Sequence, residues 1–165
     1  MITLTTFLFF LSHFCMSPFN TFDFLDYQAK NVVDSKKIKM IVGDSTIMND
    51  DLIIMYFTNI NDCQRCLIDI EVITQCVREN SDSNRSIKHY IFLRCDRDKE
   101  FELNKQRFES ISPVRRDDGN VKNQLGLSIL SRMAIFSGTG NLILSYTTDQ
   151  YNSFNCSSVS NFLPK

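Results

Sequence analysis

The feature that most constrains the fold of this chain is a continuous apolar run from Leu52 to Phe57. A strand without polar alternation is typical of the centre of a sheet that is covered on both faces. The run is followed, after a short polar loop, by apolar residues at helical spacing between about Cys63 and Arg78. A buried strand that leads into an amphipathic helix predicts an α/β domain.

Two cysteines stand at the expected start of that helix, in the sequence Cys63-Gln-Arg-Cys66. A helix N-terminus carries a partial positive charge and free N–H groups, which favour thiolate at Cys63. Cys66 lies one turn further on, within reach to close a disulfide. Arg65 would stabilise a thiolate and Asp62 would oppose it, so the net effect on the pKa is not fixed by the sequence. The position of the pair favours redox chemistry over a static disulfide.

The other elements are expected on both sides of this unit. Their order, with the central strand and helix included, predicts a mixed sheet with helices on both faces, ending in an antiparallel hairpin. The expected elements are a strand at Lys37–Val42, a strand at Ile87–Arg94, a helix at Lys99–Glu109, a short helix at Val121–Leu125 closed by Gly126, hairpin strands at Met133–Phe136 and Leu142–Tyr146, and a closing helix within Gln150–Leu163.

The 165 residues divide into an N-terminal apolar segment with a tether, 1–34, and one domain, 35–165. Met1–Leu11 has the length of a signal-peptide core and is too short for an ordinary membrane span. It lacks a preceding Lys or Arg and a following small-x-small cleavage site. We expect export, with a membrane tether through this segment as a further option, and a cytoplasmic location if the segment is not a signal.

Composition argues against two classes of site. The net charge is −1 and acidic and basic residues are interspersed, whereas a nucleic-acid binder would carry a basic face. Of the six cysteines only Cys63 and Cys66 are closely spaced, and neither a second cysteine pair nor a histidine pair completes a zinc site. We therefore expect no metal and no cofactor. Cys76, near the end of the helix, is expected to be a small apolar residue in the core, although pairing among Cys76, Cys95 and Cys156 stays open.

Three ordered segments resemble the thioredoxin fold, and more narrowly the exported bacterial thiol-disulfide oxidoreductases of the TlpA/ResA type. The resemblance spans about residues 38–149 and carries with it a location in the bacterial cell envelope or periplasm. Its landmarks are Leu52–Phe57 leading to Cys63–Cys66, then Pro113-Val114 with Asp117–Gly119 and Val121–Leu127, and then Met133–Phe136 with Gly138–Leu144.

The resemblance implies disulfide exchange with partner proteins that contain a disulfide or a dithiol, without a cofactor. Cys63 would attack and Cys66 would resolve the mixed disulfide. One departure concerns the cis-proline whose backbone helps these proteins bind their substrate chain. That position falls at about Ser131, followed by Arg132. A non-proline cis bond costs about 2.5–4 kcal/mol, so a trans bond is expected. Ser131, Arg132 and Arg65 are the candidate partner-binding or thiolate-modulating residues.

Two alternatives remain. The missing cis-proline favours a thioredoxin-fold binding or scaffold module that has lost turnover. Arg132 resembles the arginine that pairs with the reactive thiolate in peroxiredoxins, which share the fold. Against a peroxidase, Ile60 stands where those proteins have threonine, and the loop before Cys63 contains no proline.

Overall fold

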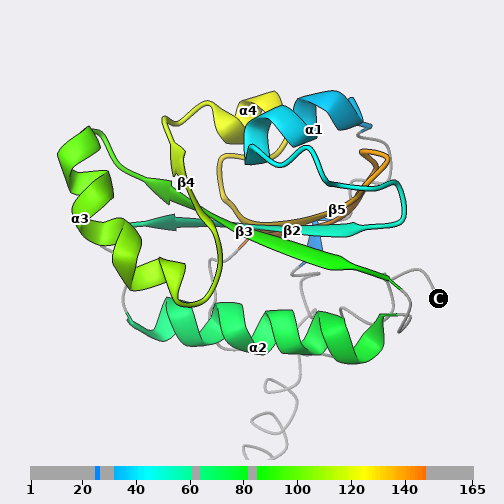
Figure 1. Cartoon of the computed structure of the whole chain (residues 1–165), viewed down its shortest axis with the longest axis horizontal. Coiled ribbons are helices and arrows are strands. Elements are labelled where there is room, and N and C mark those ends of the chain that lie inside the picture. Colours follow the sequence, from blue (N-terminus) through cyan, green and yellow to red (C-terminus); the bar gives the residue numbers. More distant parts are fainter. Residues whose placement is uncertain (1–24, 27–31, 61–63, 82–84, 148–165) are drawn as a thin grey trace, which may run out of the picture.

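The computed structural model describes residues 25–26, 32–60, 64–81 and 85–147 of the chain (Figure 1). Ten elements follow one another along these ranges. They are β1 (Leu25–Asp26), α1 (Ser35–Val42), β2 (Leu52–Asn59), α2 (Gln64–Asn80), β3 (Ile87–Arg94), α3 (Asp98–Glu109), β4 (Val114–Asp117), α4 (Val121–Gln124), β5 (Ser131–Ser137) and β6 (Leu142–Thr147).

The strands form one mixed six-stranded sheet in the order β1-β6-β5-β2-β3-β4. β2 lies between a parallel neighbour, β3, and an antiparallel one, β5. β4 extends the parallel side, and the β5–β6 hairpin extends the antiparallel side. This is the thioredoxin-like arrangement expected from the sequence, with β2–α2–β3 as its parallel crossover unit and β5–β6 as its terminal hairpin.

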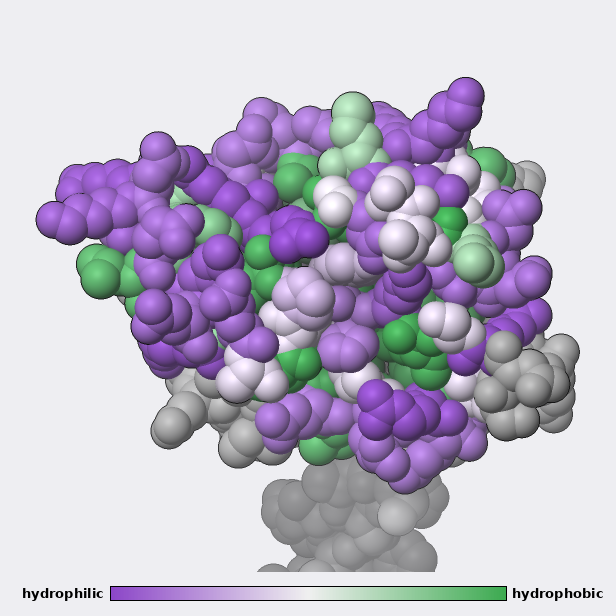
Figure 2. All heavy atoms as spheres, viewed as in Figure 1, coloured by the Kyte–Doolittle hydropathy of each residue, from purple (hydrophilic) through white to green (hydrophobic). Residues whose placement is uncertain are grey.

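Alternate residues of β2 face two separate apolar cores, which explains why the whole strand is apolar. Leu52, Ile54 and Tyr56 belong to a core shared with α2 and α3. Ile53, Met55 and Phe57 belong to a core shared with α1 and α4. Figure 1 shows the resulting layers, with α2 below the sheet and α1 and α4 above it. Figure 2, in the same view, shows that α3 presents mainly hydrophilic residues to solvent, in keeping with its charged sequence.

The expected strand at Lys37–Val42 is wrong, because these residues lie in helix α1. The Asp34 carboxylate accepts a hydrogen bond from the Lys36 backbone N–H at 2.9 Å and caps the helix. Gly43 ends it in the left-handed region, at φ 64°. The two fully buried side chains, Ile38 and Val42, are four residues apart and share one helix face. The apolar residues whose alternation suggested a strand therefore follow the four-residue spacing of one helix face.

Two strands were not expected. β4 was not among the expected elements, but the Pro113 carbonyl accepts the Ile91 backbone N–H at 3.0 Å, and Val114 packs into the core beside α3. β1 falls within the segment assigned to the tether and pairs with β6. The expected strands at Leu52–Phe57 and Ile87–Arg94, and the helices that follow them, are confirmed. The expected closing helix and Met1–Leu11 lie outside the described residues.

A buried polar contact fixes α2 against the central strand. The Tyr56 hydroxyl lies 2.8 Å from Thr74 Oγ1 and 3.3 Å from the carbonyl oxygen of Ile70, to which Thr74 donates at 2.8 Å. Burial raises the pKa of the Tyr56 phenol well above its usual value, although the Thr74 hydrogen bond opposes this. The helix that carries Cys66 is therefore held by a neutral hydrogen-bonded pair as well as by apolar packing.

Candidate cleft at the carboxyl ends of the parallel strands

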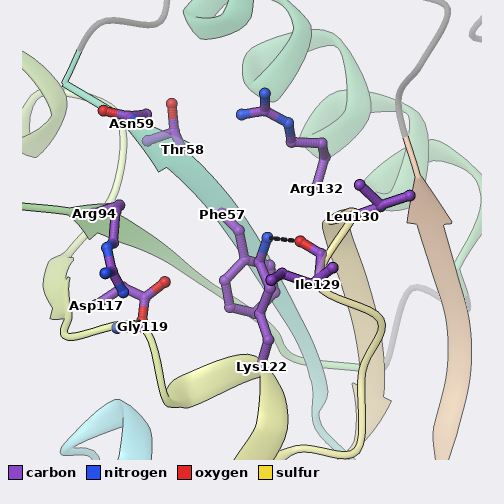
Figure 3. A pocket seen from close by; sticks show the side chains of 10 residues that line it. All are labelled: Phe57, Thr58, Asn59, Arg94, Asp117, Gly119, Lys122, Ile129, Leu130 and Arg132. Carbon is purple, nitrogen blue, oxygen red and sulfur yellow. Dashed lines mark hydrogen bonds between the residues drawn. The ribbon is translucent and has the colours of Figure 1, made fainter.

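A cleft of about 440 Å³ opens where β2, β3 and β4 end (Figure 3). Open α/β sheets bind ligands at the carboxyl ends of their parallel strands, next to the point where strand order reverses. Here that point is β2, from which the sheet extends through β3 on one side and through β5 on the other. The lining residues are Phe57, Thr58, Asn59, Arg94, Asp117, Gly119, Lys122, Ile129, Leu130 and Arg132.

The cysteine pair belongs to the same end of β2 in the sequence. β2 ends at Asn59 and α2 begins at Gln64, so Cys63 immediately precedes the helix and Cys66 lies in its first turn. The first turn of α2 contains no acidic residue that would offset the positive end of the helix dipole. Cys63 itself lies outside the described residues. The roles predicted for Cys63, Cys66 and Arg65 stay predictions.

The two residues at the cis-proline position have different environments. Ser131 is the first residue of β5; it has no exposed surface, and its hydroxyl lies 2.9 Å from that of Ser145. Every described peptide bond is trans, as expected for Ser131. Any contact of Ser131 with a partner would thus fall to its backbone. Arg132, the next residue, lines the cleft and is half-buried.

The sequence did not single out three charged residues of the cleft. Arg94 ends β3, Asp117 ends β4 and Lys122 lies in α4. Lys122 Nζ donates to the carbonyl oxygen of Ile129 at 2.8 Å and lies 5.3 Å from the centroid of the Phe57 ring. Arg94 and Asp117 each stand at the carboxyl end of a strand. Because the strand Ile87–Arg94 was predicted from the sequence, the place of Arg94 at its end could have identified this residue as a candidate for the cleft.

The cleft lining carries more positive than negative charge. Among the described residues that line it, the cations are Arg94, Lys122 and Arg132, and the one carboxylate is Asp117. Asp117 is only 5% exposed, and one of its oxygens accepts the Gly119 N–H at 2.7 Å. Figure 3 shows Arg94 and Arg132 on either side of the Phe57 ring in that view, with Lys122 beside the ring. The cleft therefore combines an aromatic floor with cationic walls.

Cys76, Cys95 and His89 are not among the residues that line the cleft. Cys76 is buried, as expected for a small apolar residue in the core, and it is disulfide-bonded, so its pairing, which the sequence left open, is settled for this cysteine. Cys95 is a free, buried thiol; desolvation, with a smaller contribution from Glu100, raises its pKa. Burial lowers the pKa of His89, as does the nearby positive charge of Arg78, and its Nδ1 is buried without a hydrogen bond.

The described ranges contain neither a candidate metal cluster nor a candidate membrane-spanning helix. No group of three or more His, Cys, Asp or Glu side chains within them is arranged to hold a metal ion. None of the helices in those ranges combines the length and apolarity needed to cross a bilayer.

Comparison with known proteins finds no matching family model and no matching curated protein. Among solved structures, similar chains include the thioredoxin domain of a thiol-disulfide oxidoreductase from Bacteroides vulgatus, at 11% identity and a TM-score of 0.45, covering 70% of this chain and 81% of that one. A secreted Mycobacterium tuberculosis disulfide oxidoreductase has 6% identity and a TM-score of 0.45, covering 81% and 92%. A thioredoxin-like protein from Porphyromonas gingivalis has 16% identity and a TM-score of 0.47, covering 64% and 69%.

Proposed function

We propose that this protein is a thiol-disulfide oxidoreductase that exchanges disulfides with partner proteins through Cys63 and Cys66. The observation that carries the proposal is the start of α2 at Gln64, between the two cysteines and one short loop after β2, the strand that contributes Phe57 to the cleft floor. A cysteine at a helix N-terminus has a lowered pKa, and thiolate is the nucleophile in exchange. A partner segment in the adjacent cleft could bring its sulfur to this position.

The proposed reaction transfers two electrons in two exchange steps. The Cys63 thiolate attacks one sulfur of a partner disulfide, so that a mixed disulfide forms and the other partner sulfur leaves as thiolate. The Cys66 thiolate then attacks the Cys63 sulfur, which breaks the mixed disulfide and releases the second partner thiolate. The partner disulfide is thereby reduced to a dithiol and the Cys63–Cys66 pair is oxidised. The reverse sequence oxidises a partner dithiol.

Substitution of the two cysteines tests this proposal. In Cys66→Ser the second step is blocked, so we expect a stable mixed disulfide between Cys63 and a model substrate that contains a disulfide. Mass spectrometry under non-reducing conditions would detect this adduct. Cys63→Ser should form no such adduct, and Cys95→Ser is a matched control that should exchange like the unmodified chain. Equal exchange rates for the unmodified chain and the Cys63→Ser variant would contradict the proposal.

A second candidate function is a binding module that retains the fold without turnover. It is favoured by the environment of Ser131, whose side chain is enclosed and bonded to Ser145 and whose peptide bond is trans. The groove at this point therefore lacks the cis-proline backbone that helps the resembling oxidoreductases bind substrate. Such a module would bind partners at the cleft in either redox state of the cysteines, whereas the enzyme requires the dithiol or disulfide form.

We further propose that the protein acts outside the cytoplasm. The disulfide at Cys76 supports this, because disulfides persist in oxidising compartments and are rare in the cytosol. The apolar Met1–Leu11 segment would supply the export signal. Cell fractionation of the tagged full chain is the direct test: recovery with the envelope or secreted fraction is expected, and recovery with cytosolic markers alone would contradict it.

A further inference from the structure

We propose that the cleft selects partner segments that carry acidic residues and an apolar residue next to the reacting cysteine. This inference rests on the proposed function and names the substrate class of the same site. An acidic peptide is the occupant that fits the charge of the described lining, in which Arg94, Lys122 and Arg132 stand against one carboxylate, Asp117. The whole chain carries a net charge of −1, so this excess of positive charge is local.

The carboxylates that the structure describes near the cleft leave this positive bias in place. Asp117 is enclosed and accepts the Gly119 N–H. Asp96 lies 3.7 Å from Arg94, but its side chain is 85% exposed, and exposed pairs of this kind contribute little. Asp118 is fully exposed at the turn; hydrogen bonding by the Asn120 backbone N–H lowers its pKa, with a smaller contribution from the Arg94 charge. Asp96 and Asp118 both lie on the Arg94 side of the cleft.

Two exposed apolar side chains form the opposite rim. Ile129 is 80% exposed and Leu130 is 56% exposed, and both line the cleft. The Lys122 ammonium donates to the Ile129 carbonyl oxygen, which ties this rim to α4. An apolar side chain of a bound segment would cover Ile129 and Leu130 while its acidic residues face the cations. The cations of the cleft and its apolar rim together thus favour a partner segment that carries acidic residues and an apolar side chain.

Binding is measured with peptides that cannot exchange, so that recognition is separated from redox chemistry. The probes are two short fluorescein-labelled peptides with Ser in place of Cys and Leu beside it, one flanked by Glu and the other by Gln. Anisotropy titrations use the full chain at low salt and at about 0.5 M salt, where the screening length is only a few ångströms. Arg132→Gln and Arg94→Gln test the cleft. Arg78→Gln, exposed near the far end of α2, is the matched control.

We expect the Glu peptide to bind about 5- to 20-fold more tightly than the Gln peptide at low salt, as several weak exposed charge pairs would allow. High salt should reduce this ratio to about 2-fold or less. Arg132→Gln and Arg94→Gln should each reduce it by about 2- to 4-fold, and Arg78→Gln should leave it unchanged. Equal binding of the two peptides, or equal effects of all three variants, overturns the inference.

The same experiment distinguishes failure of the inference from failure of the proposed function. If the chain exchanges disulfides but binds both peptides equally, the inference fails and the oxidoreductase proposal stands. If the chain prefers the Glu peptide but Cys63 exchanges no disulfide, the acidic-segment site stands and belongs to a binding module.

Discussion

Removing the hydroxyl of Tyr56 tests how α2 is held to the sheet. In Tyr56→Phe the ring keeps its apolar contacts, and the Thr74 hydroxyl keeps the Ile70 carbonyl as its acceptor at 2.8 Å. No buried donor is left without a partner, so the expected cost is that of one hydrogen bond, about 1 kcal/mol. For a chain of this length that lowers Tm by about 2–4 °C. Thr74→Val leaves the Tyr56 hydroxyl with only the longer 3.3 Å contact to Ile70, at a similar cost.

The double variant measures the contact itself. Because Tyr56 and Thr74 share one hydrogen bond, the double variant should lose less stability than the sum of the single variants, by about 0.5–1.5 kcal/mol. Urea unfolding followed by circular dichroism gives the free energies of unfolding. Ser112→Ala is the control partner for Tyr56→Phe, since its hydroxyl donates to His89 instead and the two costs should add. Strict additivity of Tyr56→Phe and Thr74→Val would refute the reasoning.

Three further predictions concern charge, backbone and thiol chemistry. Hydrogen bonds from Thr46, Tyr90 and Lys88 lower the pKa of Asp44 in the folded state, so its contribution to the free energy of unfolding is present above the unfolded pKa of about 4 and is lost as pH falls below that value. Asp44→Asn should therefore cost about 1–2 kcal/mol at pH 7 and should make stability depend less on pH in the acid range. An unchanged dependence on acid pH would argue against this hydrogen-bond network. A Cβ at Gly138 would overlap the Met48 carbonyl, whereas one at Gly119 would meet only the movable end of the Arg94 side chain. Gly138→Ala should therefore lower the free energy of unfolding by about 3 kcal/mol. Gly119→Ala, which is strained at φ 95°, should lower it by only about 1–2 kcal/mol, and the urea unfolding midpoints of the two variants would check this order. Burial raises the pKa of Cys95, so iodoacetamide at pH 8 should label it only after unfolding, and rapid labelling of the native chain would count against its buried position.

The central unit of the fold could be predicted because its two patterns admit one interpretation each. The apolar run at Leu52–Phe57 lies between polar loops; it is too short for a helix and lacks the polar alternation of a half-buried strand, so a buried strand is the interpretation that fits. The apolar residues at helical spacing in α2 continue over enough turns to identify a helix. α1 was mistaken for a strand because Ile38, Met40 and Val42 satisfy the period of a strand as well as the i, i+4 spacing of a helix. Met40 is 72% exposed, so the helical spacing is the one that the fold uses.

The strand and the cleft that the sequence did not predict depend on contacts between residues that are neighbours in the sheet but distant in the sequence. β4 is four residues long and includes two arginines, and only its pairing with β3 makes it a strand. The cleft has the same origin, because Arg94 and Asp117 are brought together by the adjacency of β3 and β4. The cysteine pair needed no such information, since its spacing and its place before a helix are local. Arg132 was found through the resemblance, at a position that the cleft includes.

The measurement that tests the central claim most directly is the reduction potential of the Cys63–Cys66 pair. The full chain is equilibrated in glutathione buffers of graded ratio, free thiols are trapped, and the peptide containing both cysteines is quantified by mass spectrometry, separately from those containing Cys76 and Cys95. The oxidoreductase account predicts a reversible midpoint between about −120 and −270 mV, the range of thiol-exchange catalysts. A pair that stays bridged below about −300 mV, or that never bridges, would contradict it.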